Sequence, residues 1–195
     1  TGGSRTRAIQ AGGRKSPSNP WPLQNVIQYF EMNSLSNSID FGDLTQATGR
    51  FDAHSDQIRM VTMGQQNATS NHMDLITIPT LGNATDFGNS TQAGEFTSAF
   101  GSRTRGLWGG RSVSDNPKNT IDYVTIATTG DAIDFGDLSQ ARYSCAGMSN
   151  SVRGAWACGY VNPGGQETID YVSISTLGNA VDFGDADTCL LYTSD

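Results

Sequence analysis

Asp-Phe-Gly triplets are the motif in this chain that most suggests chemistry. In protein kinases one such triplet binds Mg²⁺, together with a Gly-rich loop, a paired Lys and a catalytic Asp elsewhere. Four copies in turn-bounded segments do not fit that arrangement. We expect a structural role instead, with each ring packed between neighbouring units and each carboxylate accepting hydrogen bonds from nearby backbone donors. The residues are Asp40, Asp86, Asp134 and Asp182 with Phe41, Phe87, Phe135 and Phe183.

A second polar position follows each triplet, at Asp43, Asn89, Asp137 and Asp185. Paired with the triplet carboxylates it could supply the oxygen ligands that Ca²⁺ prefers. Residues three apart in a strand, however, point to opposite faces of the sheet. A calcium site is therefore the weaker interpretation, and we expect no metal or cofactor.

Catalytic sets are not evident. The chain has two histidines, His54 and His72, and neither has a Cys or carboxylate at metal-ligand spacing, so we expect surface or turn positions. No Ser stands in a nucleophile-elbow context, and no Cys–His pair is suggested. The sequence predicts a protein that is not an enzyme.

Cys145 and Cys158 lie on adjacent segments joined by a turn near Asn150. One hairpin register would place them opposite each other, which allows a cross-strand disulfide. Two buried free thiols are the favoured alternative.

The elements that position these residues form a repeat. The triplet aromatics are 46, 48 and 48 residues apart, and a fixed period in this range predicts a repeat architecture. We expect units near 1–45, 46–90, 91–138 and 139–187. An apolar fraction of 36% fits a stack of thin sheets rather than one thick core.

Four short strands recur in each unit. In the later units they are predicted at 140–148, 105–110 (repeated at 153–159), 121–128 and 132–138. In the third strand, alternation places Ile121 and Tyr123 on one face and Asp122 on the other. Gly130-Asp131 and its counterparts predict tight hairpin turns before the fourth strand. No segment predicts a helix.

Other repeated positions predict packing. Trp108 and Trp156 are expected in the core, and Arg5, Arg7, Arg103 and Arg105 are expected to link neighbouring units. The Pro-rich loop 14–24 differs in length and sequence from its counterparts at 65–71, 111–119 and 160–167, and its Trp21 has no repeat counterpart. Its Trp21, Arg14 and Lys15 are the candidate binding residues, although Trp21 could equally cover a neighbouring unit.

Net charge is −7, with a sequence pI near 4.6. Phosphate binding needs a basic stripe, so nucleic acid is not expected as a partner. No window reaches the ~18 apolar residues that predict a membrane span.

Several strings resemble kelch-like β-propeller repeats. They are Gly12-Gly13 and Gly109-Gly110, a Tyr in the third strand (Tyr29, Tyr123, Tyr171), and Arg50-Phe51 and Arg142-Tyr143 opening a unit. The segments IDYVTI and NATDFGN are also similar to repeats of marine bacteriophage structural and tail-associated proteins. The resemblance implies an all-β propeller segment of about four blades, each of four antiparallel strands, from a larger array.

The ends carry two further expectations. Residues 189–195 (CLLYTSD) read like a translated sequencing adapter, so the natural sequence is expected to stop near Thr188. The chain starts at Thr1 inside a repeat, so a signal peptide would not be visible.

The resemblance favours a non-enzymatic structural or adhesion module in a phage virion or tail. Its variable loops would contact other virion proteins and bind a host-surface glycan or protein, placing it in the virion or outside the cell. A cellular kelch-like interaction scaffold is the alternative. A propeller enzyme with catalytic residues in further blades is a third, disfavoured by the scarcity of histidine.

Overall fold

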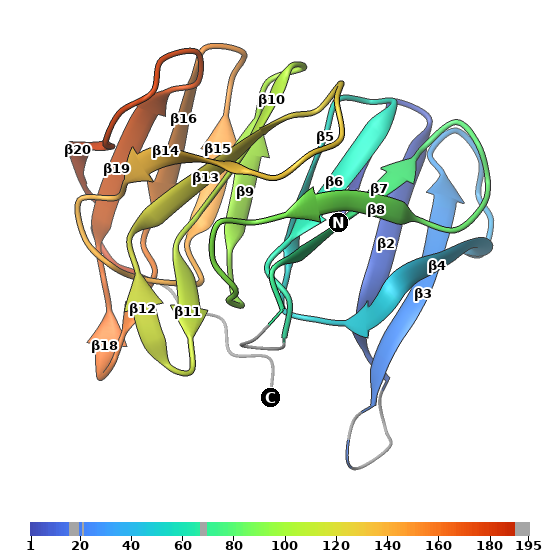
Figure 1. Ribbon diagram of the computed structural model, residues 1–195, viewed down its shortest axis with the longest axis horizontal. Coiled ribbons are helices and arrows are strands. Elements are labelled where there is room, and N and C mark those ends of the chain that lie inside the picture. Colours follow the sequence, from blue (N-terminus) through green and yellow to red (C-terminus); the bar gives the residue numbers. More distant parts are fainter. Residues whose placement is uncertain (16–19, 21, 67–69, 190–195) are drawn as a thin grey trace.

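The computed structural model describes residues 1–15, 20, 22–66 and 70–189. The described chain is all-β, as predicted, and contains no helix. It forms four four-stranded antiparallel sheets and two small two-stranded hairpins. Figure 1 shows the four sheets side by side in chain order, with the first and the fourth at opposite ends of an open row.

Each sheet is a meander of strands in sequence order. The first sheet contains β1 (Gly2–Gly3), β2 (Arg7–Arg14), β3 (Leu23–Glu31) and β4 (Ile39–Thr48). The second contains β5 (Asp52–Ser55), β6 (Arg59–Met63), β7 (His72–Thr77) and β8 (Thr85–Asn89). The third contains β9 (Ser98–Gly101), β10 (Arg105–Gly109), β13 (Thr120–Thr125) and β14 (Ile133–Asp137). The fourth contains β15 (Ala146–Ser149), β16 (Arg153–Ala157), β19 (Thr168–Ser173) and β20 (Val181–Asp185).

Two hairpins extend the later sheets. One pairs β11 (Arg111–Val113) with β12 (Asn116–Lys118), and the other pairs β17 (Tyr160–Val161) with β18 (Gly164–Gly165). Both are insertions between the second and third strands of their sheets. They lengthen this connection without disturbing the meander.

The first strand of the fourth unit is shorter than predicted. β15 begins at Ala146, not at Gln140. The segment before it joins the structure through an isolated bridge between Tyr143 and Tyr160. Its small residues are therefore used in a linker between sheets.

The predicted alternation of the third strand is confirmed. Ile121 and Tyr123 of β13 pack in the cluster shared with the fourth sheet, whereas Val124 and Ile126 pack in the cluster shared with the second sheet. Asp122 is on the second-sheet side, where it accepts a hydrogen bond from the threonine that follows β8. Ile121 and Asp122 are both 0% exposed because this sheet has a neighbour on each face. The register shift between them is a β-bulge whose extra residue lies in β14.

The predicted tight turn before the fourth strand is wrong. β13 ends at Thr125 and β14 begins at Ile133, so a longer loop joins them. Gly130 lies within it at φ 153°. The loop contacts the preceding sheet instead of forming a tight hairpin turn.

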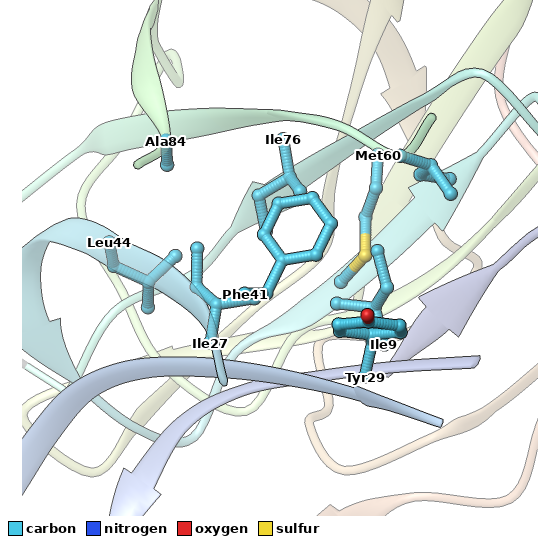
Figure 2. Packing of buried hydrophobic residues seen from close by; sticks show 9 residues of the cluster. Ile9, Ile27, Tyr29, Phe41, Leu44, Met60, Ile76 and Ala84 are labelled. Carbon is cyan, nitrogen blue, oxygen red and sulfur yellow. The ribbon is translucent and has the colours of Figure 1, made fainter. Parts of the chain in front are cut away.

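The core lies between consecutive sheets. One buried cluster combines Ile27 and Phe41 of the first sheet with Met60, Ile76 and Ala84 of the second. Figure 2 shows the ring of Phe41 beside Ile76. Two similar clusters join the second sheet to the third and the third to the fourth. Each sheet therefore depends on its neighbour for the burial that stabilises it.

Trp108 and Trp156 are core residues, as predicted, and both are 0% exposed. Their Nε1 atoms donate hydrogen bonds to the preceding sheet, to Asp52 O at 3.2 Å and to Ser98 O at 3.0 Å. A buried indole N–H needs such an acceptor. Each Trp therefore fixes both the packing and the register of two sheets.

Candidate binding surface

The connections between second and third strands gather along one edge of the row. Figure 1 shows the β11–β12 hairpin and β18 side by side at the lower edge. The tip of the first hairpin is Ser114-Asp115, with φ of 50° and 63°. Two consecutive positive φ values give a tight turn that suits the twist of a hairpin.

Three aromatic rings and one cation form a continuous stack along this edge. The ring centroids of Phe96 and Tyr143 are 5.6 Å apart, and those of Tyr143 and Tyr160 are 5.5 Å apart. The guanidinium of Arg50 lies 4.7 Å from the Phe96 centroid. We call Arg50, Phe96, Tyr143 and Tyr160 the aromatic row. None of its members is buried.

The linkers that precede each sheet hold the row in place. The amide of Phe96 donates to Arg50 O at 2.7 Å, and the amide of Ser144 donates to Phe96 O at 3.0 Å. All three residues have positive φ, at 57°, 60° and 55°. Such conformations cost of order 1–3 kcal/mol in a non-glycine residue, and this backbone ladder offsets the cost. Equivalent linkers of successive units, bonded to one another, therefore fix the backbone positions of the aromatic row.

Charge along the row is mixed. Arg50 pairs with Glu95, with N–O distances of 3.1 and 3.2 Å. Burial raises the pKa of the Tyr143 phenol, and Tyr160 and the acidic Asp115 and Glu95 raise it further. The phenol therefore keeps its proton at neutral pH. The row offers aromatic faces, hydroxyl groups, a guanidinium and a carboxylate within one strip.

The predicted binding residues lie in the corresponding connection of the first sheet. Arg14 is exposed and donates from Nε to Gln66 Oε1 at 3.1 Å. Lys15 is exposed, and its amide donates to Pro22 O at 3.1 Å. Trp21 lies outside the described residues. The aromatic row was missed from the sequence because its members come from three linkers and one hairpin.

The histidines were expected at surface or turn positions, but His54 lies in β5 and His72 in β7, and both are partly buried beside polar partners. Nε2 of half-buried His54 lies 2.8 Å from Ser102 O, and burial lowers its pKa. His72 Nε2 lies 2.6 Å from Thr45 Oγ1 and 3.3 Å from Asp74 Oδ1. Its Nδ1 lies 3.5 Å from a second carboxylate, that of Asp86.

Thr45, His72 and Asp74 place a hydroxyl, an imidazole and a carboxylate together, as in a hydrolase. The hydroxyl, however, donates to Asp74 Oδ1 at 2.6 Å, so its proton does not face the imidazole. The equivalent threonine–aspartate pair recurs at the third sheet without a histidine. There Thr91 Oγ1 donates to Asp122 Oδ1 at 2.5 Å. The arrangement is explained as a repeated hydrogen bond between sheets rather than as a nucleophile with its base.

Two buried ion pairs were not anticipated. Arg111 Nη2 lies 2.5 Å from Asp122 Oδ2, and Arg142 Nη1 lies 2.9 Å from Asp170 Oδ2. The side chains are 1% exposed or less. The signal that could have found them is the Asp in the apolar third strand, which recurs at Asp122 and Asp170 and needs a buried partner.

The triplet carboxylates bond backbone donors in three of the four units. Asp86, Asp134 and Asp182 accept from the amide two residues later at 2.9, 3.0 and 2.9 Å. No such bond involves Asp40 in the described structure. The triplet rings of Phe41, Phe87 and Phe135 are 4, 2 and 3% exposed, as expected for packing between units. Phe183 corrects that expectation, because it is 69% exposed.

The arginine prediction holds for Arg7 and Arg105. Arg7 Nη1 donates to Ile78 O and Arg105 Nη1 to Ile174 O, both at 3.0 Å and both in the next sheet. Arg59 does the same toward Ile126 O at 3.0 Å. Cys145 and Cys158 carry free thiols.

Within the described residues, no three His, Cys, Asp or Glu side chains group as a metal site would require. The described chain also has no helix with the length and apolarity needed to cross a membrane. Neither the known protein-family models nor the curated proteins match this sequence.

Proposed function

We propose that this chain is a kelch-like propeller segment that serves as a non-catalytic binding module of a phage virion or tail. The four meandering sheets packed in a row support the propeller assignment, since such sheets are the blades of that fold. The aromatic row would bind a glycan or protein on the host surface. It is the observation that carries the proposal.

The chemistry of the row suits a glycan. Aromatic faces pack on the C–H faces of pyranose rings, while Arg50, Glu95 and the tyrosine hydroxyls can bond sugar hydroxyls. Tyr and Arg are also enriched among the residues that dominate protein interfaces. Because the row has a fixed backbone, little conformational entropy would be lost on binding.

Binding to intact bacterial cells tests this proposal. We expect Tyr143→Ala and Tyr160→Ala to weaken binding at least tenfold, whereas Ile133→Ser, at an exposed position of the third sheet, leaves it unchanged. Periodate treatment of the cells should abolish binding to a glycan, and protease treatment should abolish binding to a protein. Equal binding by all three variants would contradict a role for the row.

The cellular scaffold remains the alternative function. Capsid and tail genes beside the coding sequence would support the virion assignment. Secretion or signalling genes there would support an intracellular or cell-surface interaction scaffold. In both cases the variants above should act on the same surface.

A further inference from the structure

The contacts between consecutive sheets are copied three times. In each copy the loop before the fourth strand donates two amides to the triplet segment of the preceding sheet. The first amide bonds the triplet Phe carbonyl: Gly82 to Phe41 at 2.8 Å, Gly130 to Phe87 at 2.7 Å and Gly178 to Phe135 at 2.9 Å. The second bonds two residues further on: Ala84 to Asp43, Ala132 to Asn89 and Ala180 to Asp137, all at 2.8 Å.

A side chain completes each copy. The side-chain oxygen of Asn83, Asp131 or Asn179 accepts from the amide of Asp43, Asn89 or Asp137 at 3.0, 2.9 or 3.1 Å. The triplet Gly permits this approach, since a Cβ on Gly42, Gly88 or Gly136 would overlap the loop backbone. We call the side of a sheet that carries the triplet its triplet face, and the opposite side its loop face.

The triplet face of the fourth sheet has the same groups, and no loop of the described part of the chain covers them. Phe183 is 69% exposed, and a Cβ on Gly184 would meet nothing within 4 Å. A groove of about 480 Å³ lies there, lined by Met148, Tyr171 and Phe183 among others. Exposed aromatic surface of this kind marks an interaction site.

The loop face of the first sheet is open in the complementary way. By register of the repeats, Phe30 and Met32 correspond to Ile76 and Ile78 of the second sheet. The two isoleucines are each 1% exposed because they pack on the first sheet, whereas Phe30 is 37% exposed and Met32 is 61% exposed. Asn37 likewise occupies the position of Asn83 and is exposed.

We propose that a second copy of this chain places its first-sheet loop face on the fourth-sheet triplet face, head to tail. The amides of Ser36 and Ser38 of the second copy then bond Phe183 O and Asp185 O, and its Asn37 accepts from the Asp185 amide. Its Phe30 and Met32 cover Phe183. The contact thus continues an interface that the chain already forms three times.

One further group fits this arrangement. Arg7, Arg59 and Arg105 each donate to carbonyl oxygens of the next sheet. Arg153 holds the same position in the fourth sheet and stacks on Tyr171, with 5.6 Å to the ring centroid. In the assembly its guanidinium reaches the carbonyl oxygen of Met32 of the second copy.

Sedimentation of the full chain over a range of concentrations tests the proposal, with two variants that each block one face. We expect the wild-type chain to form dimers or longer head-to-tail species. Phe183→Asp and Met32→Asp should each be monomeric, with dissociation constants raised at least 100-fold. An equimolar mixture of the two should form a heterodimer and nothing larger, because one intact interface is restored.

Ile133→Ser is the matched control. Ile133 is 56% exposed on the fourth strand of the third sheet, and it lies outside both the first-sheet loop face and the fourth-sheet triplet face. It should associate like the wild type. A wild-type chain that remains monomeric at every concentration would overturn the proposal. Failure of the two variants to form a heterodimer in the mixture would also overturn it. A head-to-tail contact joins two different faces, so each variant should supply the face that the other has lost. Circular dichroism confirms that each variant is folded.

Discussion

The amide of Gly130 donates a 2.7 Å hydrogen bond to the carbonyl oxygen of Phe87 and so joins the third sheet to the second. The two residues are the turn glycine of one unit and the triplet aromatic of the unit before it. The recurrence of the triplet is therefore explained by contacts between units. Each of the first three triplet segments accepts hydrogen bonds from the loop that precedes the fourth strand of the next unit. The glycine of these segments admits a neighbouring backbone, since a Cβ at that position would overlap the loop.

Gly136→Ala and Gly184→Ala should differ in their effect on stability. Both residues have positive φ, 145° and 134°, so both substitutions strain the backbone, by about 1–3 kcal/mol. At Gly136 the new Cβ would also lie 2.5 Å from the backbone of Gly178. We expect this variant to lose a further ~1–3 kcal/mol. Urea unfolding of both in the Met32→Asp background measures the difference, and equal losses would refute the close approach.

Asp170→Asn should be strongly destabilising. It leaves the Arg142 guanidinium buried without a counter-charge, which costs about 3–5 kcal/mol. Glu31→Gln is the control, since Glu31 forms a partly exposed ion pair with Arg7 worth about 0–1 kcal/mol. Chemical denaturation should separate the two variants clearly. Similar small losses would show that the buried pair is not formed.

The thiol of Cys145 should resist alkylation in the folded protein. Burial raises its pKa to about 11, although Arg142 nearby acts in the opposite direction. At pH 8 only about one molecule in a thousand then carries the reactive thiolate. Peptide mapping after iodoacetamide treatment should find Cys145 unmodified in the native chain and modified in guanidinium chloride. Rapid native modification would argue against its burial.

His54 should make the fold sensitive to mild acid. Burial lowers its pKa below the ordinary 6.5, while Ser102 O and the carboxylates of Asp56 and Asp52 raise it in part. The unfolded chain therefore takes up a proton before the folded chain does. Stability is intact above pH 6.5 and falls as the pH drops through the folded pKa.

His54→Gln keeps a donor for Ser102 O and removes the titrating group. Thermal unfolding at several pH values should show a flatter decline for this variant below pH 6.5. Parallel curves for the two proteins would assign the acid sensitivity to other groups.

The period of the sequence was enough to predict an all-β chain with four repeated units. The strands could be predicted from local sequence, because β-branched and aromatic residues favour strands and recur at the same positions in each copy. Burial of Trp108 and Trp156 followed because both occupy the same repeat position. These features depend on one unit at a time.

Relationships between units were not predictable in the same way. The loop around Gly130 was interpreted as a hairpin turn, because nothing local indicates that its amide bonds Phe87. Phe183 has the same neighbours in sequence as Phe135, yet one ring is 69% exposed and the other 3%. The aromatic row likewise depends on three linkers lying side by side. Each case is decided by which sheet lies next to which.

Amide hydrogen exchange tests this account most directly, because the four equivalent loop amides can be compared within one protein. In the monomeric Phe183→Asp variant, the amides of Gly82, Gly130 and Gly178 should be protected by their bonds to the preceding sheet. Ser36 occupies the same position in the first sheet, and its amide has no such bond among the described residues, so it should exchange rapidly. Rapid exchange at Gly130 as well would contradict the repeated interface on which the fold, the assembly and the binding surface depend.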